Sequence, residues 1–341
     1  MAKRKLSKQQ RIRIQKIQNR RKARASLKKS ISDEEILSLG QPGQETLGTV
    51  ISNFGSQVDI EGLEGPFKGQ VYRCHIRANL EGLVTGDIVI WRQADPYGVV
   101  VACEERNSEL IRPDAYGKLR PVAANIDRIA IVFSAKPTPY SNLIDRYLVA
   151  AETQNIQPFL VLNKVDLLDQ EDYPEITELL NIYQKVGYDI ISVSAKTGAG
   201  LNELQLYLST HTSVFVGQSG VGKSSLINKL QPAANSEVGP LSNSKDKGTH
   251  TTTTSRLYHL DGGGVLIDSP GIREFSLSHL SPDKIIHGYI DFQPYLNQCK
   301  FRDCQHLDEP DCALLTAVKD GKVLEVRLEN FRRILQSLEL K

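Results

Sequence analysis

The sequence lacks a long apolar run. Within 341 residues there is no stretch of 18 or more apolar residues, and a membrane-crossing helix needs about 20 of them. The first residues also lack the apolar segment of a secretory signal. These absences exclude a helical membrane protein and argue against secretion. We therefore expect a cytoplasmic protein without a membrane partner.

Acidic residues are absent from the first 30 positions. Thirteen Lys and Arg lie there, and the rest of the chain has 29 basic against 40 acidic residues. A basic arm on an acidic body is typical of a protein that binds a polyanion, nucleic acid before a membrane surface. Arginine-rich arms of this kind often fold only on RNA, which favours RNA. We assign residues 1–40 to this arm; the alternative is a disordered, solvated arm without a partner.

Cysteine is scarce, with five in the whole chain. Cys74 and Cys103 fall in short β-like runs and are expected to be buried. The other three lie within 14 residues together with one histidine: Cys299, Cys304, His306 and Cys312. Three thiolates and one imidazole can close a tetrahedral structural Zn²⁺ site, whereas a cytoplasmic disulfide is disfavoured. A chance cluster is the alternative. One structural zinc would stabilise a small helical domain over residues 281–341.

Short β-like runs dominate residues 41–115. Gly, Asn and Asp-Pro breaks separate the runs GTVISNF, SQVDIEG, FKGQVYRCHIR, GDIVIW and YGVVVACEER. About five short strands in roughly 60 residues favour a small barrel, with an OB-fold as the leading candidate. Such barrels often bind oligonucleotides. Four side chains form either an RNA-facing set or a solvated surface: Lys68, Arg73, His75 and Arg77.

Residues 116–280 alternate between buried strands and helices. The apolar runs IAIVFSA, FLVLNKVD, DIISVSA, SVFVG and GVLIDSP are separated by helical segments. This alternation predicts an α/β fold with a doubly wound, mostly parallel sheet.

A phosphate-binding loop follows the strand SVFVG. The segment fits the pattern G-x-x-x-x-G-K-[ST] without a mismatch and leads into a helix. Its glycines let backbone N–H groups face the phosphates, and its lysine and first serine would reach the phosphates and Mg²⁺. The helix N-terminus adds positive partial charge. The loop comprises Gly217, Gln218, Ser219, Gly220, Val221, Gly222, Lys223, Ser224 and Ser225.

Two motifs upstream of this loop favour guanine as the base. Asn163, Lys164 and Asp166 form an N-K-x-D motif at a strand end. Guanine presents N1–H and a 2-amino group as adjacent donors, which the Asp166 carboxylate can accept together; adenine has no such pair. Asn163 would bind the N7/O6 edge, and the Lys164 stem would pack on the base. The next strand end supplies Ser194, Ala195 and Lys196, whose backbone N–H groups would contact O6.

Downstream of the loop lie the candidate switch segments. Asp268 and Gly271 form a D-x-x-G motif in which Asp268 would hold Mg²⁺ through water and Gly271 would sense the γ-phosphate. A threonine run precedes it, from which we favour Thr251, then Thr252, as the residue that closes over Mg²⁺. The motifs therefore run in the usual GTPase order started in the middle. A rejoined chain keeps the same sheet when the original ends lie close together.

The whole set resembles the RsgA (YjeQ) family of small-ribosomal-subunit biogenesis GTPases. The permuted motif order, GQSGVGKSS, the His-Thr-Thr-Thr run, DSPGIREF, the basic arm and the Cys/His tail carry the resemblance. It implies an N-terminal OB-fold barrel, a circularly permuted P-loop GTPase domain and a C-terminal zinc-binding domain. It also implies slow hydrolysis of GTP to GDP, stimulated on the 30S subunit during late maturation. We expect 16S-type rRNA as the partner and a monomeric protein.

The position that often carries a water-orienting glutamine, just after D-x-x-G, is Ile272. Its side chain cannot hydrogen-bond water, so His250 in the threonine run is the best candidate, and the resemblance assigns a histidine of this motif the same catalytic role. The alternative is a structural switch histidine.

Two rival interpretations are a P-loop ATPase or kinase, which both base-reading motifs oppose, and a binding module with a vestigial nucleotide site. Three arginines near the end, Arg327, Arg332 and Arg333, would contact rRNA or form a solvated face.

Overall fold

A computed structural model of the chain describes residues 45–77, 80, 82–114, 116–168, 172–231, 255–268 and 277–339. Several predictions fall outside these ranges: the basic arm, His250, Thr251, Thr252 and Gly271. Among the described residues, no helix has the length and apolar character needed to cross a membrane.

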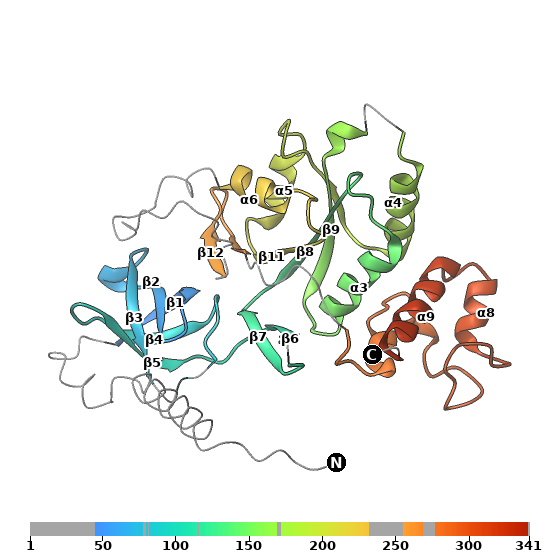
Figure 1. The fold of residues 1–341 in the computed structure, drawn as a ribbon, viewed down its shortest axis with the longest axis horizontal. Helices are drawn as coiled ribbons and strands as arrows, with labels where there is room; N and C mark the ends of the chain where they lie inside the picture. The colour runs from blue at the N-terminus through green and yellow to red at the C-terminus, as the bar shows by residue number, and fades with distance from the viewer. Residues whose placement is uncertain are drawn as a thin grey trace, which may run out of the picture.

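Five short strands close into a barrel (Figure 1). They are β1 (Glu45–Asn53), β2 (Gln57–Gly62), β3 (Val71–Ile76), β4 (Ile88–Arg92) and β5 (Gly98–Cys103). Pairing runs β1–β2–β3–β5–β4 and returns from β4 to β1, with only β3 and β5 parallel. Closure leaves no free sheet edge in the barrel. The OB-like barrel expected from the sequence is therefore confirmed.

Alternation along the strands builds the core of the barrel. Along β2, Val58 and Ile60 point inward and are fully buried, whereas their neighbours are partly exposed. The single tryptophan, Trp91, lies at the centre and contacts the rings of Phe67 and Tyr72 at centroid distances of 5.5 and 5.0 Å. Period-two burial of this kind is what a half-buried strand requires.

A second set of strands forms the doubly wound sheet. These are β8 (Arg128–Ser134), β9 (Gln157–Asn163), β10 (Ile190–Ser192), β11 (Thr212–Val216), β12 (Arg256–His259) and β13 (Val265–Asp268). Their order is β10–β9–β8–β11–β13–β12, and every pair is parallel except β12 with β13. The carboxyl ends of the parallel strands therefore meet at one edge, where ligands bind in such sheets. Strand β11, which precedes the phosphate loop, lies between β8 and β13.

Helices cover both faces of this sheet. They are α3 (Ser141–Glu152), α4 (Pro174–Val186), α5 (Leu201–Leu208) and α6 (Lys223–Leu230). Along β8, Ile129 and Ile131 join the core that includes residues of α3 and α4, whereas Ala130 and Val132 join the core that includes residues of α5 and α6. In the described part of the chain, single-turn 3₁₀ helices lie at Gly65–Phe67, Val165–Leu167 and Gln293–Tyr295.

A β-hairpin connects barrel and sheet. It consists of β6 (Glu109–Pro113) and β7 (Leu119–Ala124), and the boundary expected at residues 115/116 falls in its turn. Leu110 is buried with α3 residues, and the Ile111 N–H donates to Gln154 Oε1 at 2.6 Å. The hairpin therefore packs on the helical layer of the sheet.

The barrel and the sheet are hydrogen-bonded to each other. Strand β12 pairs antiparallel with β1, with Ser52 opposite Arg256, so eleven strands form one continuous arrangement. The buried Thr85 hydroxyl donates to the Ser255 carbonyl at 3.3 Å. In Figure 1, β12 accordingly lies between the barrel and the rest of the sheet.

The C-terminal part is helical, as expected. It contains α7 (Pro282–His287), α8 (Ala313–Lys319) and α9 (Glu325–Glu339), and α9 packs along α3 (Figure 1). The rRNA or solvated-face expectation is wrong for Arg327, whose side chain is fully buried, because two aspartates compensate its charge. Arg332 donates to the main-chain carbonyls of His306 and Leu307. Arg333 is exposed and pairs with Glu329 on its own helix.

Candidate nucleotide site and metal centre

The phosphate loop joins β11 to α6 in a conformation that needs glycine. Gly217, Gly220 and Gly222 have φ values of +140°, +84° and +93°, which L side chains rarely adopt. Lys223 opens α6, and its ammonium donates to the carbonyls of Gly217 at 2.6 Å and Gln218 at 2.8 Å. Lys223 thus lies across the phosphate loop to which its motif assigns it. Ser224 and Ser225 follow in the first turn of α6.

The two base-reading motifs come together at neighbouring strand ends. The Ser194 hydroxyl donates to Asp166 Oδ1 at 2.6 Å, and Lys196 Nζ lies 3.7 Å from Asp166 Oδ2. The Ser194 hydrogen bond lowers the pKa of the Asp166 carboxyl, with Lys196 adding to the shift. Asp166 is therefore an ionised acceptor at neutral pH, the state that a pair of guanine donors requires.

Asn163 connects all three loops. Its buried amide donates from Nδ2 to the Val221 carbonyl of the phosphate loop at 2.9 Å. Its Oδ1 accepts from the Ala195 N–H at 3.1 Å. An amide has two N–H donors, so one remains for the N7/O6 edge assigned to it from the sequence. The loop-bridging role is additional, and sequence reasoning missed it because it depends on which strands are neighbours.

Lys164 spans the site at a left-handed backbone position, with φ +63°. Its ammonium donates to the Gly220 carbonyl at 2.7 Å and to the Lys136 carbonyl at 2.6 Å. Lys136 follows β8, whose carboxyl end lies at the same edge of the sheet. The loop after β8 is therefore a fourth loop at the site, which the sequence reasoning missed. The end of the buried run IAIVFSA is the sequence feature that could have pointed to it.

The residues expected near Mg²⁺ are described only in part. Asp268 ends β13, directly beside β11, and Ser224 lies in the first turn of α6, which follows β11. This places both on the phosphate-loop side of the sheet. His250, Thr251 and Gly271 lie outside the described residues, so their assignments remain predictions.

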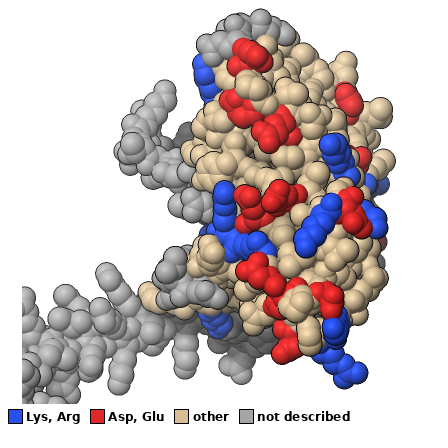
Figure 2. All heavy atoms as spheres, turned by 90° about the vertical axis from the view of Figure 1, so that its right-hand side faces the viewer, with Lys and Arg blue, Asp and Glu red and all other residues tan. Residues whose placement is uncertain are grey.

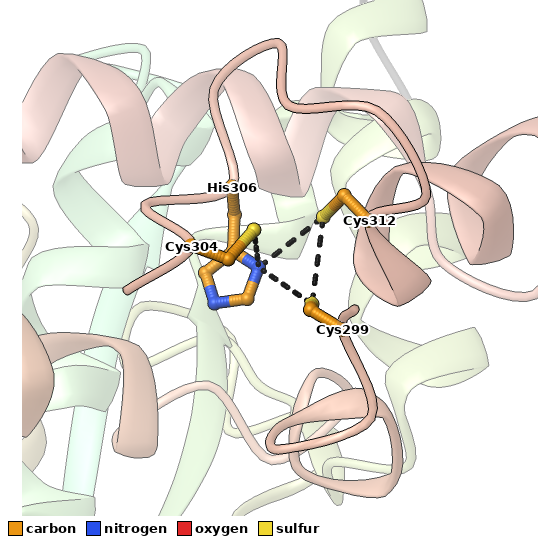
Figure 3. A group of neighbouring side chains, drawn as sticks. All are labelled: Cys299, Cys304, His306 and Cys312. Carbon is orange, nitrogen blue, oxygen red and sulfur yellow. Dashed lines mark hydrogen bonds between the residues drawn. The ribbon is translucent and has the colours of Figure 1, made fainter. Parts of the chain in front are cut away.

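Three cysteines and one histidine converge in the C-terminal part (Figure 3). His306 Nδ1 lies 3.6 Å from Cys299 Sγ, 3.7 Å from Cys304 Sγ and 3.3 Å from Cys312 Sγ, and the Cys299 and Cys312 sulfurs are 3.8 Å apart. A tetrahedral zinc with Zn–S bonds of about 2.3 Å has sulfur–sulfur edges of about 3.8 Å. The four donors therefore have the spacing of a closed Cys₃His site.

The chemistry of these donors also fits zinc. Burial raises the pKa of the Cys304 thiol to about 12 and lowers that of the His306 imidazole. These two groups therefore lose hydration in the fold, and a cation that binds thiolates and imidazole compensates this loss. The Ala313 N–H donates to Cys299 Sγ at 3.4 Å, which orients one ligand. A zinc ion held by this set would have no open position.

Further hydrogen bonds fix residues 299–312, here called the metal loop. The Glu309 carboxylate accepts three backbone N–H groups, from Gln305 and Leu307 at 2.8 Å each and from Asp308 at 3.2 Å. These bonds lower the pKa of the Glu309 carboxyl. From α9, the Arg332 guanidinium donates to the carbonyls of His306 and Leu307. The loop is thus fixed both internally and to α9.

Similarity to known proteins extends over all three parts of the chain, namely the barrel, the GTPase sheet and the C-terminal helical part. The family model "RsgA GTPase" matches residues 103–278. Proteins named small ribosomal subunit biogenesis GTPase RsgA are similar over 99% of this chain and 98% of their own length: 54% identical over 341 residues in Ectopseudomonas mendocina and 54% over 339 in Pseudomonas aeruginosa.

Two solved structures show the same architecture. YjeQ from Thermotoga maritima has a TM-score of 0.71 and 32% identity, covering 87% of this chain and 100% of its own. YloQ, described as a circularly permuted GTPase, has a TM-score of 0.68 and 28% identity, covering 87% and 96%.

Fold and site together define a circularly permuted P-loop GTPase with an OB-like barrel and a C-terminal Cys₃His cluster. It hydrolyses GTP to GDP and phosphate. The chain belongs to the RsgA family.

Proposed function

We propose that this GTPase is a cytoplasmic assembly factor that acts, as a monomer, in late maturation of the small (30S) ribosomal subunit. The observation that carries the proposal is the extent of the similarity. Relatives named for small-subunit biogenesis match 99% of the chain, including the barrel and the metal loop as well as the GTPase domain. A shared nucleotide site alone would support only a GTPase.

GTP binds, in this proposal, between the loops at the carboxyl edge of the sheet. Asp166 accepts the guanine donors, Lys164 and Ala195 flank the base, and the 217–225 loop surrounds the phosphates. The Ser224 hydroxyl and Thr251 would hold Mg²⁺ directly and Asp268 would hold it through water, and the ion would compensate the phosphate charge. Support comes from the hydrogen bonds of Asn163 and Lys164, which hold the base-reading and phosphate loops against each other.

Hydrolysis requires a group that orients the attacking water. Ile272 stands where many GTPases have glutamine, and we assign the role to His250. An imidazole can accept a hydrogen bond from water and orient it toward the γ-phosphate. Because His250 lies in a switch segment, we expect slow hydrolysis until the 30S subunit fixes its position.

Binding to 16S-type rRNA rests mainly on the basic arm and the barrel. On the face shown in Figure 2, the Lys and Arg of the described residues are interspersed with Asp and Glu and form no broad basic surface. In the C-terminal part, Lys322 pairs with Asp320 (3.2 Å) in the connection between α8 and α9, and Arg333 pairs with Glu329 (3.3 Å) on α9. Residues 1–30, with thirteen basic and no acidic residues, supply the charge that neutralises phosphates.

The barrel adds ring surfaces that suit unpaired bases. Arg73 lies over the ring of Phe54 at 4.4 Å from its centroid, although it also pairs with Asp59. His75 meets Tyr97 edge to face at 5.1 Å. Phe54 and Tyr97 are about half exposed, at 49% and 41%. Exposed aromatics beside arginine form the platforms on which single-stranded bases stack.

The test is GTP turnover with and without purified 30S subunits, for the wild type and for His250→Ala. We expect stimulation of the wild type by 30S, with both basal and stimulated turnover reduced in the variant and GDP affinity retained. Equal turnover with and without 30S in the wild type would refute the ribosomal assignment. Normal stimulation of His250→Ala would refute only the role of the histidine.

A further inference from the structure

A buried charged cluster joins the C-terminal helix to the GTPase domain. Arg327 of α9 and Asp145 of α3 are both fully buried, and Arg327 Nη1 donates to Asp145 Oδ1. Arg327 also donates to both oxygens of Asp291, from Nη2 at 2.8 Å and from Nε at 3.2 Å. Its guanidinium lies 4.5 Å from the ring centroid of Tyr289. Such a cluster tolerates little displacement, because moving one partner leaves an uncompensated buried charge.

The same aspartate fixes three helices to one another. Asp145 Oδ1 accepts from the Tyr183 hydroxyl of α4 at 2.7 Å, and Oδ2 accepts from Asn330 Nδ2 of α9 at 2.9 Å. The Tyr183 hydroxyl also lies 2.9 Å from the Ser141 carbonyl at the start of α3. Asn142 of α3 donates to the Asn330 carbonyl at 3.1 Å. The position of α3 along α9 is therefore set by directional contacts as well as by apolar packing.

The beginning of α3 leads directly to the nucleotide site. The segment 135–140 connects β8 to α3 and contains the Lys136 carbonyl. That carbonyl accepts from the Lys164 ammonium at 2.6 Å and from the Ser134 hydroxyl at 2.8 Å. Lys164 belongs to the motif proposed to pack on guanine. A shift of α3 would move this acceptor away from Lys164.

The other side of α9 reaches the metal loop. Arg332, on the same helix as Arg327, donates to the carbonyls of His306 and Leu307. A continuous series of contacts thus runs from the metal loop through α9 and α3 to Lys164. Each link is a hydrogen bond or a covalent connection of a few residues.

We propose that Arg327 is a positioning residue for guanine-nucleotide binding. Together with Asp145 it holds α3 where the Lys136 carbonyl can orient Lys164. It thereby couples nucleotide affinity to the docking of α9, and of the metal loop that α9 contacts, on α3. The inference rests on the proposed contact of Lys164 with the base. Because coupling between two sites is reciprocal, nucleotide should in turn tighten the docking of α9.

The first test compares Arg327→Met with Arg333→Met, a matched control on the exposed side of the same helix. GDP affinity, turnover at saturating GTP, zinc content and helical content are measured on each. We expect Arg327→Met to raise the Kd for GDP by about 5-fold or more, the lower end of typical couplings. Turnover per folded molecule should change little, because Lys164 contacts the base and not the γ-phosphate, and the control should behave as the wild type.

A role in folding alone predicts a different result. It would lower the folded or zinc-loaded fraction and leave the GDP affinity of the remaining molecules unchanged. A folded, zinc-loaded Arg327→Met with wild-type GDP affinity therefore overturns the proposal. Asp166→Asn serves as the second control: if it too leaves GDP affinity unchanged, the guanine-site assignment itself fails, whereas a loss only in Asp166→Asn refutes Arg327 alone.

Hydrogen exchange on the unaltered chain decides the question if Arg327→Met does not fold. Adding GDP should slow exchange of the backbone amides at residues 325–332, which lie far along the chain from every proposed nucleotide contact. Unchanged exchange in this segment, with slowed exchange in the 217–225 loop, would contradict the coupling.

Discussion

The His259 imidazole of β12 pairs with the Glu61 carboxylate of β2, with Nε2 and Oε2 2.5 Å apart. This contact spans the junction between the GTPase sheet and the barrel, beside the pairing of Ser52 with Arg256. The hydrogen bond that the imidazole donates to Glu61 raises the pKa of His259, although partial burial opposes the shift. Protonated His259 therefore adds an ion pair to the strand pairing that already joins the two parts.

This pair gives the stability of the barrel junction a defined pH dependence. Since the pKa of folded His259 is raised, its contribution is full below the unfolded value of about 6.5 and is lost as pH rises through the folded value. Glu61→Gln should destabilise the chain at about pH 5.5 by at most about 1 kcal/mol, because the imidazole is 60% exposed, and should have no such effect at about pH 9.

Urea unfolding at the two pH values measures the difference. Glu45→Gln is the matched control, because Glu45 pairs with Arg92, which keeps its charge over this range. A Glu61→Gln effect of the same size at both pH values would rule out the histidine as the titrating partner.

Gly222→Ala should abolish tight nucleotide binding. A Cβ at this position would lie 2.4 Å from Asn163 Nδ2, and the φ of +93° adds strain for any L side chain. Gly187→Ala is the control, because it has a similar φ of +102° with nothing within 4 Å of the added carbon. Both variants should lose about 1 kcal/mol of stability from the backbone. Only Gly222→Ala should lose GDP affinity, measured by equilibrium titration; equal affinities would contradict the clash expected with Asn163.

Asn163→Ala should weaken GTP binding without removing a phosphate contact. The amide bridges Val221 and Ala195, so its loss leaves a buried carbonyl and a buried N–H unpaired, and it also removes the hydrogen bond proposed to the N7/O6 edge of guanine. Unsatisfied groups of this kind cost about 1–3 kcal/mol, so we expect roughly 5- to 150-fold weaker affinity. Asn181→Ala, at an exposed position of α4, should bind as the wild type. Wild-type affinity in Asn163→Ala would show that the loops hold together without the bridge.

Metal analysis of the purified chain should find about one zinc per molecule, because the four donors form one closed site. Cys312→Ser should lose it, and chelation should release the 299–312 loop and expose it to proteolysis. Cys103→Ser, which changes a cysteine in the barrel outside the cluster, should retain the zinc. A chain that folds and resists proteolysis equally well without metal would refute a structural role.

Local chemistry explains why much of this site could be predicted from sequence. The phosphate loop needs glycine at φ values that other residues avoid, and the metal site needs particular donors at short spacing. A short sequence motif is therefore enough to predict each of them. Cys74 and Cys103 were both expected to be buried from their strand patterns: Cys74 is fully buried, whereas Cys103, at the end of β5, is only partly buried. The permuted order could be inferred because each motif keeps its own strand end.

Contacts between distant segments could not be predicted in the same way. Arg327 looked like a surface residue because a helical pattern does not reveal that Asp145 and Asp291 converge on one of its positions. The Lys136 carbonyl carries no side-chain signature, and the pairing of β1 with β12 depends on how barrel and sheet dock. These features depend on tertiary neighbours, which a single sequence does not specify.

The two motifs upstream of the phosphate loop, N-K-x-D and Ser194–Lys196, are central to this account because together they form one guanine-binding site. This assignment is tested most directly by titrating wild type and Asp166→Asn with GTP, ATP and xanthosine triphosphate. Xanthine carries a carbonyl in place of the 2-amino group, so an asparagine amide can pair with its N1–H and this oxygen. We predict that the wild type prefers GTP and that Asp166→Asn loses GTP and gains the xanthine nucleotide. Comparable affinity of the wild type for ATP and GTP, or unaltered GTP binding by Asp166→Asn, would contradict it.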